Sequence, residues 1–71
     1  MALKGIEIIL NGAKETIHDG VSIARLMGIF NESDKGLIIE LNGRFVSARE
    51  YSITFLSEGD GVEFIYAACG G

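Results

Sequence analysis

The sequence predicts a small α+β domain, in which a mixed sheet of four to five strands carries one main helix on one face. Two stretches rich in β-branched residues meet at Asn11-Gly12, the strongest short signal for a β-hairpin. A helical period follows Ser22, and two further apolar stretches follow at 37–43 and 62–67. Together these observations predict a hairpin, then a helix, then further strands.

The hairpin strands are expected at Gly5–Leu10 and Ala13–His18, with Asp19-Gly20 closing the second. Ser22 is a favoured helix N-cap residue, and 31–36 supplies the stop and a polar loop. The apolar side chains between them recur with the spacing i, i+3, i+4, i+7: Ile23, Leu26, Met27 and Phe30. We therefore expect a short amphipathic helix that is held by packing.

The third strand, at 37–43, ends in a second Asn-Gly turn and has a short extension at 45–46. The stretch 47–61 lacks a sustained period, so we expect an irregular connection with one short helical turn near Tyr51. The last strand is expected at 62–67. If the first and last strands lie side by side in the centre of the sheet, the arrangement is the β-grasp fold.

Alternation of side chains along the strands assigns two faces to the sheet. The side chains expected to face the helix are Ile6, Ile8, Leu10, Leu37, Ile39, Leu41, Val62, Phe64 and Tyr66. The opposite face receives Glu7, Ile9, Ile38, Glu40, Glu63 and Ile65. The isoleucines Ile9, Ile38 and Ile65 among glutamates are either ordinary scattered surface aliphatics or a docking face for a protein partner.

Aromatic side chains contribute large buried areas in so small a domain. We expect Phe30, Phe45, Phe64 and Tyr66 to pack in the core. Tyr51 and Phe55 are expected to hold the irregular connection against it. His18, the only histidine, is expected at a surface position, and Asp60 is expected to act as a turn former.

Composition excludes several classes of function. The chain has 71 residues and a net charge of −4, and its six lysines and arginines are scattered, which argues against nucleic-acid binding. One cysteine allows no internal disulfide, and no His/Cys cluster has zinc-ligand spacing. No window approaches the roughly 20 apolar residues that span a membrane. We expect one cytoplasmic domain at 1–67, followed by a flexible tail at 68–71.

The chain ends in Gly70-Gly71, which adds nothing to a core. Without a Cβ atom, an extended Gly-Gly segment can enter a narrow slot and bring the terminal carboxylate to a buried reaction centre. That carboxylate is ionised at neutral pH and can attack an activated phosphate. The mixed anhydride with AMP is then open to displacement by a sulfur nucleophile. Cys69 suggests a sulfur relay, but we interpret it as a tolerated small residue because the chemistry needs only the carboxylate.

The whole chain resembles the ThiS-type sulfur carriers of thiamine biosynthesis, within the ubiquitin-like β-grasp group that includes the small subunit of molybdopterin synthase. The resemblance rests on the Asn11-Gly12 hairpin, "VSIARLM", "IIELNGRFV" (38–46), "EGDGVEFI" (58–65) and the terminal Gly70-Gly71. Within this group, the compact length fits the ThiS type best. The resemblance therefore implies a protein co-substrate that carries sulfur and is not itself an enzyme.

The resemblance also implies the partners. An E1-like, ThiF-like adenylyltransferase would use ATP and magnesium to adenylate Gly71, and this chain would bind no cofactor itself. A persulfide, such as that of a cysteine desulfurase, would then replace AMP and leave a thiocarboxylate. A ThiG-like thiazole synthase would take the sulfur.

Three alternatives stay open. Val46-Ser47-Ala48 stands where the family often has Val-Pro-Arg, so the sulfur could serve molybdopterin or another sulfur-containing product. The chain could also be a ubiquitin-like modifier whose Gly71 is joined to a lysine amine. The last alternative is a plain binding module with an accidental Gly-Gly end.

Overall fold

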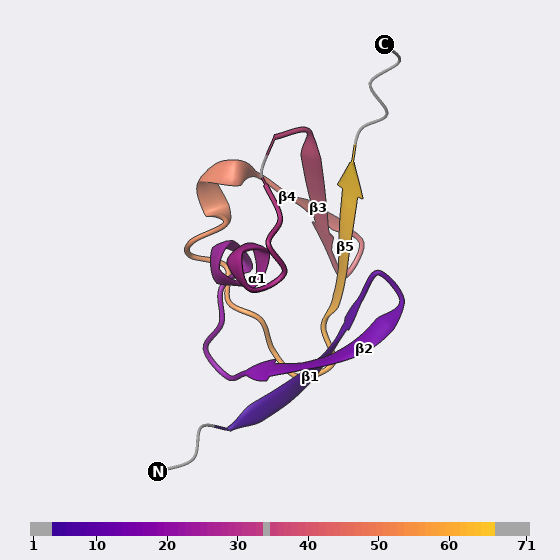
Figure 1. The fold of residues 1–71 in the computed structure, drawn as a ribbon, viewed down its shortest axis with the longest axis vertical. Helices are drawn as coiled ribbons and strands as arrows, with labels where there is room; N and C mark the ends of the chain where they lie inside the picture. The colour runs from indigo at the N-terminus through magenta and orange to yellow at the C-terminus, as the bar shows by residue number, and fades with distance from the viewer. Residues whose placement is uncertain (1–3, 34, 67–71) are drawn as a thin grey trace.

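The computed structural model describes residues 4–33 and 35–66 of the chain. Within these ranges the chain forms five strands, one α-helix and one 3-10 turn (Figure 1). In chain order they are β1 (Gly5–Leu10), β2 (Ala13–His18), α1 (Ile23–Ile29), β3 (Leu37–Leu41), β4 (Arg44–Val46), η1 (Ala48–Glu50) and β5 (Gly61–Tyr66). The predicted elements are confirmed, including the short helical turn that precedes Tyr51.

The strands form one sheet in the order β2-β1-β5-β3-β4. The first and last strands are parallel neighbours in its centre, with Ile9 opposite Gly61 and Leu10 opposite Val62. The other three pairings are antiparallel. The helix packs on one face of this mixed sheet, so the predicted β-grasp fold is confirmed (Figure 1).

Two Asn-Gly pairs set the registers of the two hairpins. Asn11 and Gly12 have φ angles of 50° and 84°, and Asn42 and Gly43 have φ angles of 53° and 80°. A two-residue turn with positive φ at both positions matches the right-handed twist of the strands that it joins. Asparagine and glycine are the residues that adopt this conformation at least cost.

The helix begins and ends where the sequence predicted. At its start, the Oγ atom of Ser22 accepts a hydrogen bond from the backbone N–H of Arg25 at 3.1 Å. At its end, Asn31 has a φ of 57° and donates its N–H to the carbonyl of Gly28 at 3.1 Å. The next N–H, that of Glu32, reaches the carbonyl of Met27 at 2.8 Å, which completes a Schellman motif.

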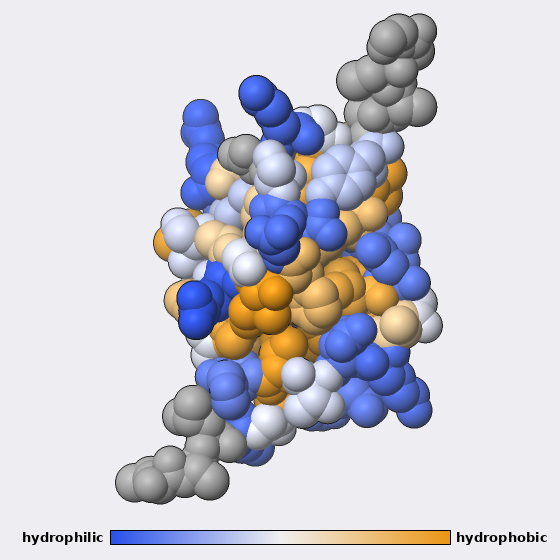
Figure 2. Space-filling view, in the orientation of Figure 1, coloured by the Kyte–Doolittle hydropathy of each residue, from blue (hydrophilic) through white to orange (hydrophobic). Residues whose placement is uncertain are grey.

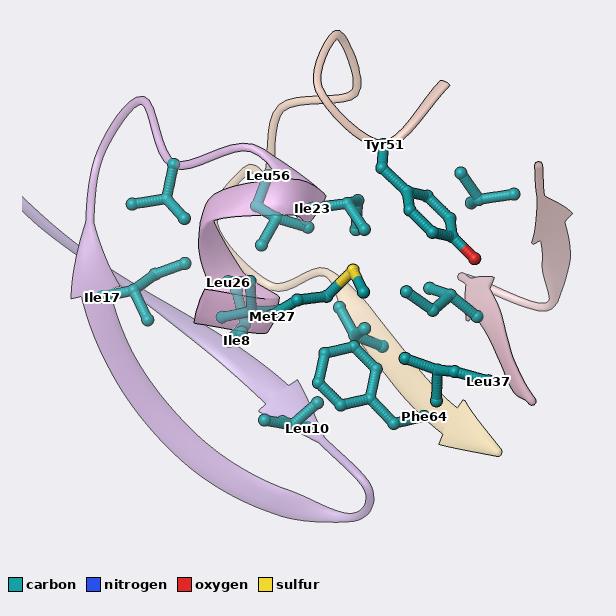
Figure 3. Close-up of a cluster of buried hydrophobic side chains, with 14 of the residues drawn as sticks. Ile8, Leu10, Ile17, Ile23, Leu26, Met27, Leu37, Tyr51, Leu56 and Phe64 are labelled. Carbon is teal, nitrogen blue, oxygen red and sulfur yellow. The ribbon is translucent and has the colours of Figure 1, made fainter. Parts of the chain in front are cut away.

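The core lies between the helix and the sheet (Figure 3). Five side chains are almost completely buried there: Ile8, Ile23, Leu26, Ile39 and Val62. Leu10, Leu37 and Phe64 join them from the sheet, and Leu41 and Phe30 pack partly buried at the margin. All members of the predicted helix-facing set except Tyr66 are therefore buried or packed against the core; Tyr66 lies on the same face of the sheet but is exposed.

The connection after β4 is fastened to the start of α1. The N–H of Ile23 bonds to the carbonyl of Thr54, and the N–H of Ala24 bonds to the carbonyl of Tyr51, both at 2.9 Å. Tyr51 is buried, as predicted, and Leu56 fills the core beside it. This connection therefore closes one side of the core with η1 as its one regular element between β4 and β5.

Three aromatic predictions are wrong. Phe45, Phe55 and Tyr66 are exposed by 68%, 59% and 51%. In β4 the core position belongs to Val46, so Phe45 points to the opposite face beside Glu40. Phe55 pairs with Ser22 through its backbone, while its neighbour Leu56 is buried. Tyr66 lies at the very end of β5 and contacts Glu32 in the loop after α1.

Candidate functional site

The predicted chemistry depends on Gly70 and Gly71, and these residues, with Cys69 and the 67/68 domain boundary, lie outside the described residues. What the structure describes is the strand that leads to them. β5 ends at Tyr66, five positions before the last residue. In Figure 1 the β5 arrow runs away from the β1–β2 hairpin toward the C-terminal end of the chain.

The central position of β5 fixes the direction in which the chain leaves the domain. On one side, the N–H groups of Ile9 and Asn11 donate to the carbonyls of Asp60 and Val62, both at 2.9 Å. On the other side, β3 pairs with β5 from Val62 through Tyr66. β5 is thus paired on both edges at its start and with β3 alone as far as Tyr66, so the chain after Tyr66 leaves the domain from a paired strand.

The side chains of the two hairpin asparagines reinforce this strand. The Oδ1 atom of Asn11 accepts a hydrogen bond from the N–H of Phe64 at 2.8 Å. The Oδ1 atom of Asn42 accepts one from the N–H of Gly61, also at 2.8 Å. The sequence indicated both asparagines as turn residues only, because nothing local reveals that their side chains reach β5.

Asp60 organises the turn that enters β5. Its Oδ1 atom accepts from Nδ2 of Asn42 at 3.0 Å, and its Oδ2 atom accepts from the N–H of Ser57 at 2.8 Å. Both carboxylate oxygens of Asp60 thus accept hydrogen bonds from groups around this turn. The prediction that Asp60 is a turn former is confirmed.

The root of the tail is tied to the helix side of the domain by one side-chain contact. The hydroxyl of Tyr66 donates a hydrogen bond to Oε1 of Glu32, which lies in the loop after α1. Phe64, two positions earlier, is buried in the core. The end of β5 is therefore held by the packing of Phe64 in the core and by the polar contact of Tyr66 with Glu32.

The face of the sheet opposite the helix carries the predicted docking residues. Ile38 and Ile65 lie directly opposite each other and are exposed by 37% and 38%. Ile9, which is partly buried, lies opposite Gly61, four positions before Ile65 on β5. The structure thus places two of the three isoleucines as a pair near the end of β5 and the third farther along the same face.

Two glutamates separate these isoleucines. Glu40 and Glu63 lie directly opposite each other, and the exposed Phe45 lies opposite Glu40 on the next strand. Carboxylates in directly opposite positions repel each other. The face therefore carries the apolar pair Ile38 and Ile65 and the exposed ring of Phe45 beside two adjacent carboxylates. This combination suits a partner surface that is basic and apolar.

The described residues offer no candidate metal site. Within 4–33 and 35–66, no group of three or more His, Cys, Asp or Glu side chains could hold a metal ion, and no polar or charged residue is buried. His18 is exposed at the end of β2, as predicted. No helix in these ranges is long and apolar enough to cross a membrane.

Elsewhere, a groove lies between β2 and α1. Ile17, Val21 and Ile29 line it, together with His18 and Arg25. Figure 2 shows apolar surface in this region, between the helix and the first hairpin. The groove lies at the hairpin end of the molecule, away from the end of β5, so it is not part of the site at the tail.

The family of the chain follows from a match that includes the tail. The model of the ThiS family matches residues 5–71, which covers nearly the whole chain and reaches the final Gly-Gly. This chain belongs to the ThiS family. Among curated protein sequences, none matches it significantly.

Two solved structures of thiamine biosynthesis proteins have the same fold. A crystal structure of the thiamine biosynthesis protein ThiS from Geobacter metallireducens is 25% identical, with a TM-score of 0.82 over 93% of this chain and 100% of that one. A solution structure of a thiamine biosynthesis protein from the same organism is also 25% identical, with a TM-score of 0.75 over 93% of this chain and 88% of the other. The ThiS resemblance predicted from the sequence is thus confirmed.

Proposed function

We propose that this ThiS-family protein is a sulfur carrier of thiamine biosynthesis, and that its Gly71 carboxylate becomes a thiocarboxylate. The observation that carries this proposal is the family match over 5–71, because it includes the terminal glycines on which the chemistry depends. The central position of β5 in the sheet supports it, because the terminal glycines follow this strand in the sequence. The protein is a co-substrate and not a catalyst.

The proposed cycle has three steps. A carboxylate oxygen of Gly71 attacks the α-phosphorus of ATP in an E1-like, ThiF-like adenylyltransferase, releasing pyrophosphate and forming an acyl adenylate. The terminal sulfur of a persulfide, such as one supplied by a cysteine desulfurase, attacks the acyl carbon and AMP leaves. A thiol then reduces the resulting acyl disulfide, which frees the thiocarboxylate for a ThiG-like thiazole synthase. ATP and magnesium are used by the activating partner.

We further propose that these partners dock on the face of the sheet opposite the helix, which we call the open face. Ile38 and Ile65 form its apolar part near the root of the tail, and Ile9 extends it along β1. Glu40 and Glu63 favour a partner with a basic group opposite the middle of the face. Because the face and the tail root lie on the same strand, a partner on this face is close to Gly71.

The test is to incubate the purified protein with its cognate adenylyltransferase, ATP, magnesium and a sulfide source, and to measure the intact mass. The expected result is the mass gain of one oxygen-to-sulfur exchange. A chain that lacks Gly70-Gly71 is the matched control and should keep its mass. An unchanged mass in both, although the enzyme is active on another carrier, would contradict the proposal.

Two further observations separate the alternatives. Copurification with thiazole synthase would support thiamine as the product that receives the sulfur. Copurification with the large subunit of molybdopterin synthase would instead indicate molybdopterin. Conjugates of higher mass on a denaturing gel would instead indicate a ubiquitin-like modifier. If deletion of the two glycines changed nothing in cells, the chain would be a plain binding module.

A further inference from the structure

β5 has one paired edge and one open edge over its last residues. β1 pairs with β5 only at Gly61 and Val62, whereas β3 pairs with it through Tyr66. The first strand stops because the chain turns back at Asn11-Gly12. In Figure 1, the distal half of β5 accordingly has β3 beside it but lies beyond the hairpin.

Asn11 marks the place where the ladder ends. Its backbone N–H bonds to the carbonyl of Val62, and its side chain then receives the N–H of Phe64. Alternation along the strand aims the next main-chain groups at the same edge, namely the carbonyl of Phe64 and the N–H of Tyr66. Among the described residues no strand continues the ladder past this point. An unpaired strand edge is a template for another extended segment.

The length of chain after Tyr66 brings a partner to this edge. Five residues, 67–71, follow it. Even a fully extended segment of that length spans at most about 16–18 Å. Any enzyme that acts on the carboxylate of Gly71 must therefore place its own surface within that distance of the end of β5. The open edge of β5, at Phe64 and Tyr66, lies where that segment begins.

We propose that an extended segment of the adenylating partner adds to the open edge of β5, bonding to the main chain of Phe64 and Tyr66. The inference rests on the proposed function, since it is adenylation that requires the enzyme at Gly71. Addition to a strand edge gives affinity through main-chain bonds and fixes register. Because Phe64 is buried and Tyr66 is tied to Glu32, the edge is already ordered before the partner arrives.

Amide hydrogen exchange measured by NMR tests this without altering the protein. The N–H of Tyr66 should exchange rapidly in the free protein and at least about tenfold more slowly in the complex with the adenylyltransferase. The N–H of Glu63, which faces β3, is the control and should be protected in both states. Equal exchange at Tyr66 in the two states would overturn the inference. So would protection in the free protein that rises with its concentration, because the occupant would then be a second copy.

A backbone variant gives a second, independent readout. Incorporation of the α-hydroxy analogue of tyrosine at position 66 replaces that N–H by an ester oxygen and keeps the side chain. The variant should stay folded and bind the adenylyltransferase about three- to tenfold more weakly, the effect of one net hydrogen bond. The matched control is the corresponding ester at Thr16, whose N–H points off the outer edge of β2 by alternation along the strand.

The outcomes separate this inference from the proposed function. If wild-type protein gains sulfur while the Tyr66 amide and ester show no effect, the edge inference alone fails. Equal weakening by the esters at Tyr66 and Thr16 would also overturn it. If the wild-type protein gains no sulfur, the proposed function fails first.

Discussion

The Oδ1 atom of Asn11 accepts a hydrogen bond from the backbone N–H of Phe64 at 2.8 Å, across 53 positions of sequence. The bond joins the hairpin at the start of the chain to the strand at its end. Asn11 also occupies a turn position with a φ of 50°. One residue thus sets the turn, ends the β1–β5 ladder and satisfies an N–H next to a buried ring.

Replacing Asn11 by glycine should therefore destabilise the fold, although glycine suits the turn. The variant keeps the positive φ but leaves the N–H of Phe64 without its acceptor, so we expect a loss of about 1–2 kcal/mol in the free energy of unfolding, measured in urea. Asn11→Asp keeps an oxygen acceptor and should lose less. The control is Asn31→Gly, at an exposed position with a φ of 57°. Equal losses for the two glycine variants would show that the side-chain bond contributes nothing.

The packing of α1 on the sheet should dominate stability. Leu26 is 0% exposed, so Leu26→Ala removes a fully buried side chain and leaves a cavity. We expect a loss of about 2–5 kcal/mol in the free energy of unfolding. Ile53→Ala, at a side chain that is 70% exposed, is the matched apolar truncation and should change stability by less than about 0.5 kcal/mol. A small effect at Leu26 would contradict the core described here.

The opposed carboxylates on the open face should lower stability. Glu63→Gln removes the repulsion with Glu40 and should raise the free energy of unfolding by about 0.2–1 kcal/mol at low salt. The gain should shrink as salt is added, because exposed charges are screened. Glu15→Gln on the edge strand β2 serves as the control. If the same change weakens binding of the adenylyltransferase, the pair is kept for the partner; a loss of stability would contradict the repulsion.

A charge in place of Ile65 should separate docking from folding. Its side chain is 38% exposed on the open face, opposite Ile38, so Ile65→Asp should leave the chain folded and weaken partner binding at least about tenfold. Ile53→Asp adds the same charge at another exposed isoleucine and should leave binding unchanged. Calorimetric titration with the adenylyltransferase measures both. Unfolding of the Ile65 variant would place that residue in the core instead.

Much of this fold could be predicted from local signals. The Asn-Gly turns, the Ser22 cap and the periods of two and 3.6 residues located the strands and the helix, because each depends on neighbours within one turn or strand. The alternation also correctly assigned Ile39 to the buried face of the sheet and Ile38 to the exposed face. Elements whose formation depends on nearby residues are the ones that the sequence reveals.

The errors lie where burial depends on how far the helix reaches. Alternation assigned Tyr66 to the helix face, but α1 has only seven residues and the ring lies exposed at the end of β5. Phe45 was expected to pack because it is aromatic, yet the neighbouring Val46 takes the core position. The reach of Asn11 to Phe64 could not be predicted either, since the contact exists only once β1 and β5 are paired.

The most direct test of the central claim is to locate the transferred sulfur by fragmenting the C-terminal peptide in a mass spectrometer after the reaction with the adenylyltransferase. We expect the sulfur in the carboxyl group of Gly71, in place of one oxygen, in both the wild-type protein and a Cys69→Ser variant. Sulfur found on the side chain of Cys69, and lost in the Cys69→Ser variant, would contradict it.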